Sequence, residues 1–254
     1  MQDLTQAGQV RLHIEQGIAT VEFGHPAHNS LPGHLLRKLA HNLLEVGKHP
    51  DVRVIVLKSE GERSFCAGAS FDELLALKDA EAARHFFMGF AAVINACRLC
   101  GKMVIGRVQG KAVGGGVGLA AATDYCLATV HASVKLSELA IGIGPFVVGP
   151  AVERKIGLSA MTQMTLDATN WKSAVWAQEK GLFAELHDNI PALDDAVQGL
   201  AERLAASHPA ALAQLKRVFW EGTEDWDTLL AVRAAMSGEL VLSAPAQAAI
   251  RKFK

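Results

Sequence analysis

Residues 110–124 read GKAVGGGVGLAAATD, and three consecutive glycines, Gly114 to Gly116, open the alanine-rich part of this stretch. Glycine loses more backbone freedom on folding than alanine does, at a cost of about 0.5–1 kcal/mol in regular structure. The alanine-rich part has helical character, so the glycines mark a helix start at which side chains are excluded. Three physical reasons would explain such a start.

A dinucleotide-binding fingerprint is the first reason. The stretch GVGLAA, residues 116–121, fits the relaxed GxGxxA spacing, follows a predicted strand and precedes an acidic residue, Glu138, by about twenty residues. However, about a hundred residues of predicted sheet and helix come before it, and Glu138 lies in a glycine-rich loop and does not end a strand. A phosphate-binding loop of the form GxxxxGK[ST] is absent from the sequence. Nucleotide binding is therefore the weaker explanation.

Close packing and exposed backbone are the other two reasons. The glycines would let a strand and a helix approach closely, or they would leave N–H groups at the helix start open to an anion or a developing oxyanion. The stretch CAGAS, residues 66–70, is a second loop of small residues between a predicted buried strand and a helix. Two such loops would aim two N–H donors at one carbonyl oxygen.

The rest of the chain alternates strands and helices early and becomes helical late, which predicts an α/β fold. Residues 10–23 alternate apolar and polar positions on either side of Gln16-Gly17, and this pattern predicts a β-hairpin. Other elements follow from apolar runs and helical stripes. They are strands at 52–58, 103–110 and 125–130, helices at 35–46 and 80–97, an extended loop at 134–150, and helices from 151 onward, broken at Pro191 and Pro209.

Length and charge limit the possible functions. The chain has 254 residues, half of them hydrophobic, which is enough for one large core. Lys and Arg number 25 and Asp and Glu 26, so no overall basic charge favours binding to nucleic acid or to an anionic membrane. The sequence shows neither a signal peptide nor an apolar run long enough to span a membrane, and we expect a cytoplasmic protein.

Cysteine and histidine patterns predict no metal and no disulfide framework. The four cysteines, Cys66, Cys97, Cys100 and Cys126, are too few for a disulfide scaffold in a chain of this length. Cys97 and Cys100 form a CxxC pair, but no second pair of ligands lies at suitable spacing. Neither HExxH nor the GxSxG nucleophile motif occurs.

Six motifs together resemble the enoyl-CoA hydratase/isomerase family, also called the crotonase superfamily, in order and approximate spacing. The resemblance covers nearly the whole chain and is specific in combination, although each motif is weak by itself. The motifs are HPAHNSL (25–31), SFCAGASFDEL (64–74), VQGKAVGGGVGLAAATDYCLAT (108–129), LSELAIGIGP (136–145), ATNWKSAVWAQEKGL (168–182) and SHPAALAQLK (207–216).

The resemblance implies an architecture and a substrate class. The fold would be an α/β, crotonase-like spiral of repeated strand-strand-helix units over residues 1–195, which would bind the coenzyme A thioester and carry the catalytic site. Residues 196–254 would form a helical C-terminal region that builds homotrimers, often paired into hexamers. The substrate would be an acyl-CoA thioester, with coenzyme A as part of the substrate and no separate cofactor.

Carried over residue by residue, the resemblance also implies the site. The backbone N–H groups of Ala69 and Gly115 would form an oxyanion hole, and Glu138 would be the acid/base. The basic ending RKFK, residues 251–254, resembles the family's usual basic ending, which helps to hold the coenzyme A phosphates. Further implied substrate contacts are Pro26, Ala27, Ser64, Cys66, Ala67, Gly68, Gly114, Gly118 and Pro145.

One departure from the family pattern bears on the reaction. Family hydratases usually carry a catalytic Glu where this chain has Gly118. Moving a double bond from C3 to C2 needs only one base, so a single Glu138 favours isomerisation slightly over hydration. The sequence IGIGPFVV after Glu138 also resembles family isomerases.

Several alternatives remain open at this level. Glu138 alone could hydrate a 2-enoyl-CoA, with Asp72 or Glu73 as candidate second acids, although both are expected on a solvent face. The chain could instead be a noncatalytic acyl-CoA binder. Thioester hydrolysis ranks lower, because Phe146 lies near the position where the family's hydrolases carry an Asp. Asp124 matches a structural position of the family.

Overall fold

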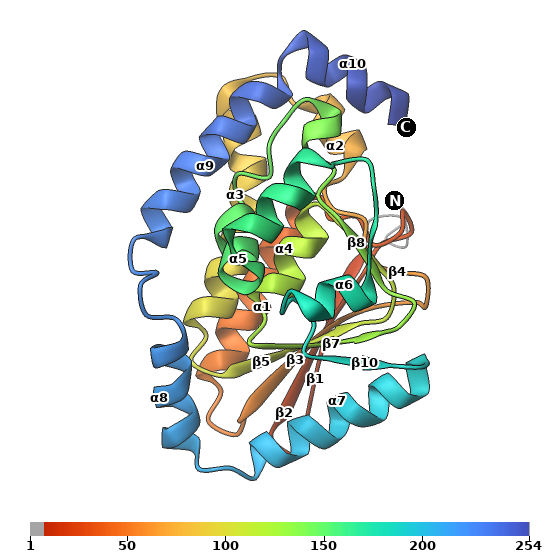
Figure 1. The fold of residues 1–254 in the computed structure, drawn as a ribbon. Helices are drawn as coiled ribbons and strands as arrows, with labels where there is room; N and C mark the ends of the chain where they lie inside the picture. Colours follow the sequence, from red (N-terminus) through yellow and green to blue (C-terminus); the bar gives the residue numbers. More distant parts are fainter. Residues whose placement is uncertain (1–7, 254) are drawn as a thin grey trace, which may run out of the picture.

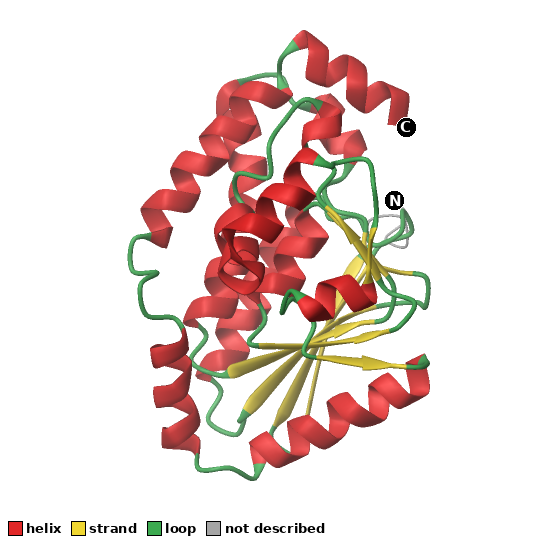
Figure 2. Cartoon of the chain, in the orientation of Figure 1, coloured by secondary structure: helices red, strands yellow, loops and turns green. Residues whose placement is uncertain are grey.

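A six-stranded sheet and a four-stranded sheet organise residues 8–253, which the computed structural model describes (Figures 1 and 2). The first two strands of the larger sheet are antiparallel, and the other neighbours are parallel. Gln16 and Gly17 both have positive φ, 49° and 82°, as the tight turn of the predicted hairpin requires. In spatial order the strands are β1 (Gln9–Glu15), β2 (Ile18–Gly24), β3 (Val54–Ser59), β5 (Met103–Val108), β7 (Tyr125–Thr129) and β10 (Glu185–His187).

The smaller sheet consists of strands of only two or three residues. Such strands are too short to show an apolar period, so sequence periodicity does not predict them. They are parallel except for the last pair. In spatial order they are β4 (Ser64–Cys66), β6 (Lys111–Val113), β8 (Ser133–Lys135) and β9 (Lys172–Ser173).

The chain winds as a spiral in which each turn contributes one strand to each sheet and then helix. This confirms the predicted strand-strand-helix repeat. The loop predicted at 134–150 contains β8 and a short 3-10 helix, η1 (Leu139–Ile141). The helices that follow the successive pairs are α2 (Phe71–Ala76) and α3 (Ala80–Leu99) after β3-β4, α4 (Gly115–Ala122) after β5-β6, and α5 (Gly149–Leu166) after β7-β8.

Helices cover both faces of the larger sheet (Figure 1). On one face α1 (Gly33–Lys48) packs with α3, and on the other α7 (Ile190–Ala205) runs beneath the strands. The strand β3 is apolar along most of its length because both its faces are covered. Pro191 and Pro209 stand at helix N-termini and begin α7 and α8, so they separate helices as predicted.

The C-terminal helices are fixed to the spiral by a buried ion pair. Asp124 Oδ2 accepts hydrogen bonds from Lys216 Nζ at 2.6 Å and from Val104 N at 2.7 Å, and Oδ1 accepts one from Trp220 Nε1 at 2.7 Å. This agrees with the expected structural role of Asp124. The remaining helices are α6 (Ala174–Glu179), α8 (Pro209–Phe219), α9 (Trp226–Val241) and α10 (Ala244–Phe253).

The α7 helix contains the predicted boundary between residues 195 and 196, and that boundary stays a prediction. Within residues 8–253, no single helix has the length and hydropathy to cross a membrane. The helices α9 and α10 have this length and hydropathy only when they are taken together, and the chain bends by 79° between them.

Candidate active site

Each glycine of the run faces a different neighbour. Gly114 has φ +53° and ψ −117°, a conformation suited to glycine, and a Cβ there would lie 2.9 Å from Glu138 Oε1. A Cβ on Gly115 would overlap the ring of Phe90, and one on Gly116 would lie 2.5 Å from the carbonyl oxygen of Cys66. Close packing therefore explains why all three positions exclude side chains.

The same packing leaves two backbone donors without partners. Gly115 is the first residue of α4, and neither its N–H nor that of Ala69 donates a hydrogen bond to another described residue. The two loops touch, because a Cβ on Gly68 would lie 2.8 Å from Val113 O and 3.5 Å from Gly115 N. Gly68 itself has φ +84°, which turns the loop toward α4.

Ala69, Gly115 and Glu138 line one cavity of about 50 Å³. Its other predicted residues are Ala67, Gly68, Gly114 and Pro145, so seven of the twelve implied site residues meet there. Among the described residues, the only polar side chains on the cavity wall are those of Ser137, Glu138 and Ser237. The remaining wall has no polar side chain and consists of Gly144 and the apolar residues Phe71, Leu74, Phe87, Phe90, Ile141, Ile143, Phe146, Val147 and Val148.

Glu138 precedes η1, and its carboxylate is turned into this apolar surrounding. Its Oε2 is shielded from solvent and has no hydrogen-bond partner among the described residues. Burial raises the pKa of Glu138 from 4.5 to about 7, opposed by a smaller lowering from its own backbone N–H. A carboxyl group with a pKa near neutrality is suited to taking and returning a proton.

Gly118 lies behind the cavity wall. It is buried in α4, and a Cβ there would overlap the side chain of Val148, which itself lines the cavity. The position where family hydratases carry a second Glu is therefore packed against a valine. No second carboxylate lines the cavity within residues 8–253.

The other implied contacts lie around the cavity and not on it. Ser64 lines an adjoining hollow of about 310 Å³, which shares Ala67 with the cavity. Pro26 lines a different hollow, and Ala27 is exposed. The thiol of Cys66 is fully buried, and burial raises its pKa to about 12.

The charged candidates from the sequence lie elsewhere. Asp72 is exposed, and Glu73 Oε2 accepts a hydrogen bond from Gly33 N at 2.7 Å, so Glu73 stabilises the start of α1. Neither residue lines the cavity. Of the basic ending, Arg251 and Lys252 are exposed on α10, and Lys254 lies outside the described residues.

A basic cluster that is not predicted from the sequence borders the adjoining hollow. The ammonium groups of Lys111 and Lys135 lie 5.2 and 4.6 Å from the ring centroid of Trp171. Arg63 and His28 also line this hollow, together with Lys111 and Trp171. None of these three Lys and Arg residues has an ion-pair partner within the described chain. The residues come from separate segments, so no local spacing reveals them.

Buried thiols and metal ligands show no further site. All four cysteines are buried and free of disulfides. Among residues 8–253, no group of three or more His, Cys, Asp and Glu side chains is arranged to hold a metal ion. The expectation that no cofactor is needed stays a prediction.

Known proteins match the chain over most of its length. The family model described as enoyl-CoA hydratase/isomerase matches residues 13–253. A (7aS)-7a-methyl-1,5-dioxo-2,3,5,6,7,7a-hexahydro-1H-indene-carboxyl-CoA hydrolase from Rhodococcus jostii is 31% identical over 75% of this chain and 72% of its own. A peroxisomal Delta(3,5)-Delta(2,4)-dienoyl-CoA isomerase from Arabidopsis thaliana is 26% identical over 85% and 81%. The crystal structure of an enoyl-CoA hydratase from Mycobacterium avium is 26% identical, with a TM-score of 0.84 over 96% and 95%.

Proposed function

The chain belongs to the enoyl-CoA hydratase/isomerase family, and from that premise we propose that it moves the double bond of a 3-enoyl-CoA thioester to C2. The enzyme type follows from the family, whereas the choice of isomerisation rests on the site. The observation that carries it is the carboxylate of Glu138, which is shielded, unpaired at Oε2 and the only carboxylate on the described cavity wall.

In the proposed reaction Glu138 takes a proton from C2 of the substrate. The electron pair of the broken C–H bond forms the C1–C2 double bond of an enolate, and the negative charge moves to the thioester oxygen. The N–H groups of Ala69 and Gly115 stabilise that oxygen. Glu138 then returns the proton to C4, where the electron pair of the C3=C4 bond forms the new C4–H bond. The C1=C2 pair of the enolate becomes the C2=C3 bond, and an electron pair on the oxygen re-forms the thioester carbonyl. Proton and electron pairs balance within substrate and enzyme, so the step needs no metal or redox cofactor.

Isomerisation is favoured over hydration by what surrounds Glu138. Hydration requires a water held in position, and two carboxylates are the simplest way to hold it. Val148 packs where a second carboxylate at position 118 would project, and the remaining walls are mostly apolar. Apolar cavity walls also strengthen the interaction of the N–H donors with the enolate oxygen.

The nucleotide end of coenzyme A is proposed to occupy the adjoining hollow of about 310 Å³, which the basic cluster borders. Lys111 and Arg63 supply positive charge without acidic partners, and the Trp171 ring offers an apolar surface. The hollow adjoins the cavity through Ala67, so a thioester with its carbonyl at Ala69 would extend into it. The role of the C-terminal RKFK segment in holding these phosphates stays a prediction. A Lys111→Glu change should raise KM for enoyl-CoA with little change in kcat.

We also propose a cytoplasmic homotrimer or hexamer, with acyl-CoA as the partner molecule and no nucleic acid or membrane. Exposed apolar side chains on the C-terminal helices support an assembly, and sedimentation velocity measures its size. The side chains concerned are Val218 and Phe219 on α8 and Val232, Met236 and Leu240 on α9.

A spectrophotometric comparison tests the reaction. Isomerisation of a 3-enoyl-CoA creates a conjugated thioester and increases its ultraviolet absorbance, whereas hydration of crotonyl-CoA removes it. We expect turnover of the first substrate to exceed that of the second, and both to be lost in a Glu138→Gln variant. Fast hydration without isomerisation would refute the isomerase proposal in favour of a single-Glu hydratase. No turnover of either substrate, with tight acyl-CoA binding, would favour the noncatalytic binder.

A further inference from the structure

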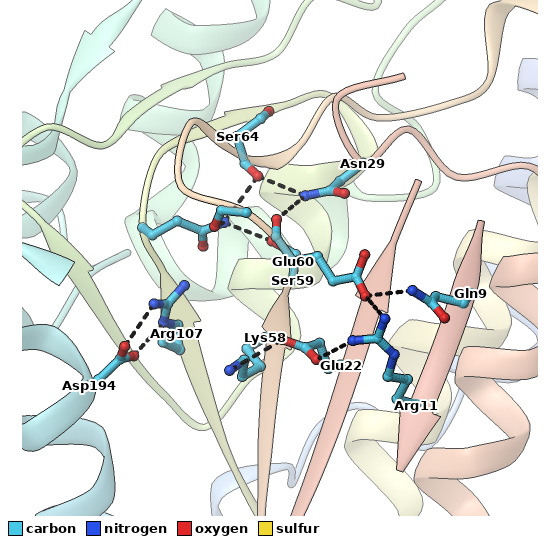
Figure 3. A network of polar contacts seen from close by, with 12 residues as sticks. Gln9, Arg11, Glu22, Asn29, Lys58, Ser59, Glu60, Ser64, Arg107 and Asp194 are labelled. Carbon is cyan, nitrogen blue, oxygen red and sulfur yellow. Dashed lines mark hydrogen bonds and ion pairs between the residues drawn. The ribbon is translucent and has the colours of Figure 1, made fainter. Parts of the chain in front are cut away.

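We propose that Asn29 and Gln109 are positioning residues that hold the 66–70 loop so that the Ala69 N–H points at the thioester oxygen. The inference rests on the proposed oxyanion hole and adds two residues that do not touch the substrate. Both side-chain amides converge on one backbone carbonyl, that of Ser64, where the strand leading to this loop begins. Figure 3 shows the Asn29 amide beside Ser64.

Asn29 reaches this carbonyl from the loop between β2 and α1. It is 7% exposed and has φ +59°, a left-handed conformation that Asn tolerates better than most residues. Its Nδ2 donates to Glu60 O at 2.8 Å and to Ser64 O at 2.9 Å. Its Oδ1 accepts a hydrogen bond from His25 N at 3.0 Å. The two donated hydrogen bonds therefore tie this loop to the segment of residues 60–64, and the accepted one closes a turn within the loop itself.

Gln109 reaches the same carbonyl from the end of β5. It is 2% exposed, and its Nε2 lies 3.0 Å from Ser59 Oγ, 3.0 Å from Gly61 O and 3.1 Å from Ser64 O. Two N–H protons are thus shared among three acceptors. Its Oε1 is buried without a partner among the described residues. Burying an unpaired amide oxygen is costly, so this side chain is placed for its donors.

The 66–70 loop needs this support because its strand is weak. The strand β4 has three residues, and its pairing with β6 shifts register between Ser64 and Cys66. Beyond it, Ala67 N donates to His28 O at 3.2 Å, and Leu31 N donates to Gly68 O at 2.7 Å. The segment that carries Asn29 therefore holds both the start of β4 and the loop that follows it.

The expected effect is loss of transition-state stabilisation with the substrate contacts kept. Displacing a reacting group by about 1 Å reduces rates by about a hundred-fold, and losing one oxyanion donor reduces them by about a hundred- to a thousand-fold. We expect Asn29→Gly, which keeps the left-handed backbone, and Gln109→Met, which keeps the volume, each to lower kcat about ten-fold or more. KM should change much less than kcat.

A spectroscopic readout separates positioning from simple loss of stability. Acetoacetyl-CoA is an enolisable thioester whose enolate absorbs in the near ultraviolet, so an oxyanion hole raises the bound enolate fraction without turnover. We expect the wild type to raise this fraction and both variants to lose most of the effect when folded and saturated with ligand. Asp194→Asn is the matched control, because it weakens the Arg107–Asp194 ion pair of the same region outside the site (Figure 3). It should lower stability and leave the enolate fraction unchanged.

The outcomes distinguish this inference from the proposed function. Variants with a wild-type enolate fraction and wild-type kcat would refute the positioning role alone. A wild type that stabilises the enolate without isomerising 3-enoyl-CoA would refute isomerisation, and loss of the effect in the variants would still support the inference. A wild type that does not raise the enolate fraction would refute the oxyanion hole and the inference together.

Discussion

Replacing Glu138 by Gln should change stability as well as activity, and the two effects have the same physical origin. Burial raises the pKa of Glu138 from 4.5 to about 7, so the folded chain binds this proton more tightly than the unfolded chain does. Each pKa unit corresponds to about 1.36 kcal/mol. Ionising Glu138 above its folded pKa therefore lowers the free energy of unfolding by about 3 kcal/mol.

The direction in which the free energy of unfolding changes with pH follows from proton binding. Between pH 4.5 and about 7 the folded chain binds more protons at Glu138 than the unfolded chain, so this residue makes stability fall as pH rises. A glutamine does not titrate. We expect the stability of Glu138→Gln relative to wild type to increase by about 2–3 kcal/mol between pH 5 and pH 8. Comparing the two pH values removes any constant effect of the buried amide.

Urea unfolding at several pH values and one protein concentration measures this difference, because assembly would make stability depend on concentration. The same variant should lose at least about a hundred-fold in kcat, the usual scale of general acid/base catalysis. In the wild type, kcat/KM should rise with pH through about 7 as Glu138 ionises. A stability difference that does not change with pH would refute the buried carboxylate, and near-normal activity would refute its catalytic role.

Three further tests concern the surroundings of Glu138 and the fold that holds them. Gly118→Glu alone should clash with Val148. Combined with Val148→Ala, it should increase hydration of crotonyl-CoA about ten-fold relative to isomerisation, which corresponds to about 1.4 kcal/mol in the activation barrier. No gain in the double variant would refute that geometry. Gly115→Val should lose turnover, acyl-CoA binding and stability because of the adjacent phenylalanine ring, and normal turnover would refute the oxyanion hole. Asp124→Asn should destabilise the fold by about 3–5 kcal/mol, because it leaves Lys216 buried without its anion. The kcat of the folded fraction should not change, and a change in kcat would contradict a purely structural role for Asp124.

The fold was predictable wherever one element had enough residues to show a period. The helices at 33–48 and 80–99 and the strand at 54–59 have continuous apolar stripes or runs, and sequence periodicity predicts them within a few residues. The strand at 64–66 has no period to detect, because it contains only three residues. Its position depends on hydrogen bonds from Asn29 and Gln109, which are distant in sequence.

The site was predictable where backbone chemistry fixes residue type. Gly114, Gly115 and Glu138 stand in recognisable motifs, and the structure brings all three to one cavity wall. Phe90 and Val148 are also decisive, but any large apolar residue in a helix or loop looks alike in sequence. Their importance arises only when α3 and the start of α5 pack against α4.

The missing carboxylate at position 118 and the raised pKa of Glu138 are consistent with each other. A second carboxylate near Glu138 would raise its pKa further through repulsion between like charges and would add another buried charge. Val148 at this place instead adds apolar wall to the cavity, and desolvation is the main cause that raises the pKa of Glu138 to about 7. A single base with that affinity releases a proton at C4 about as readily as it takes one at C2, which is what a proton transfer along one face of an allylic system requires. The proposed isomerase chemistry therefore depends on Val148 as well as on Glu138, because both line the same cavity.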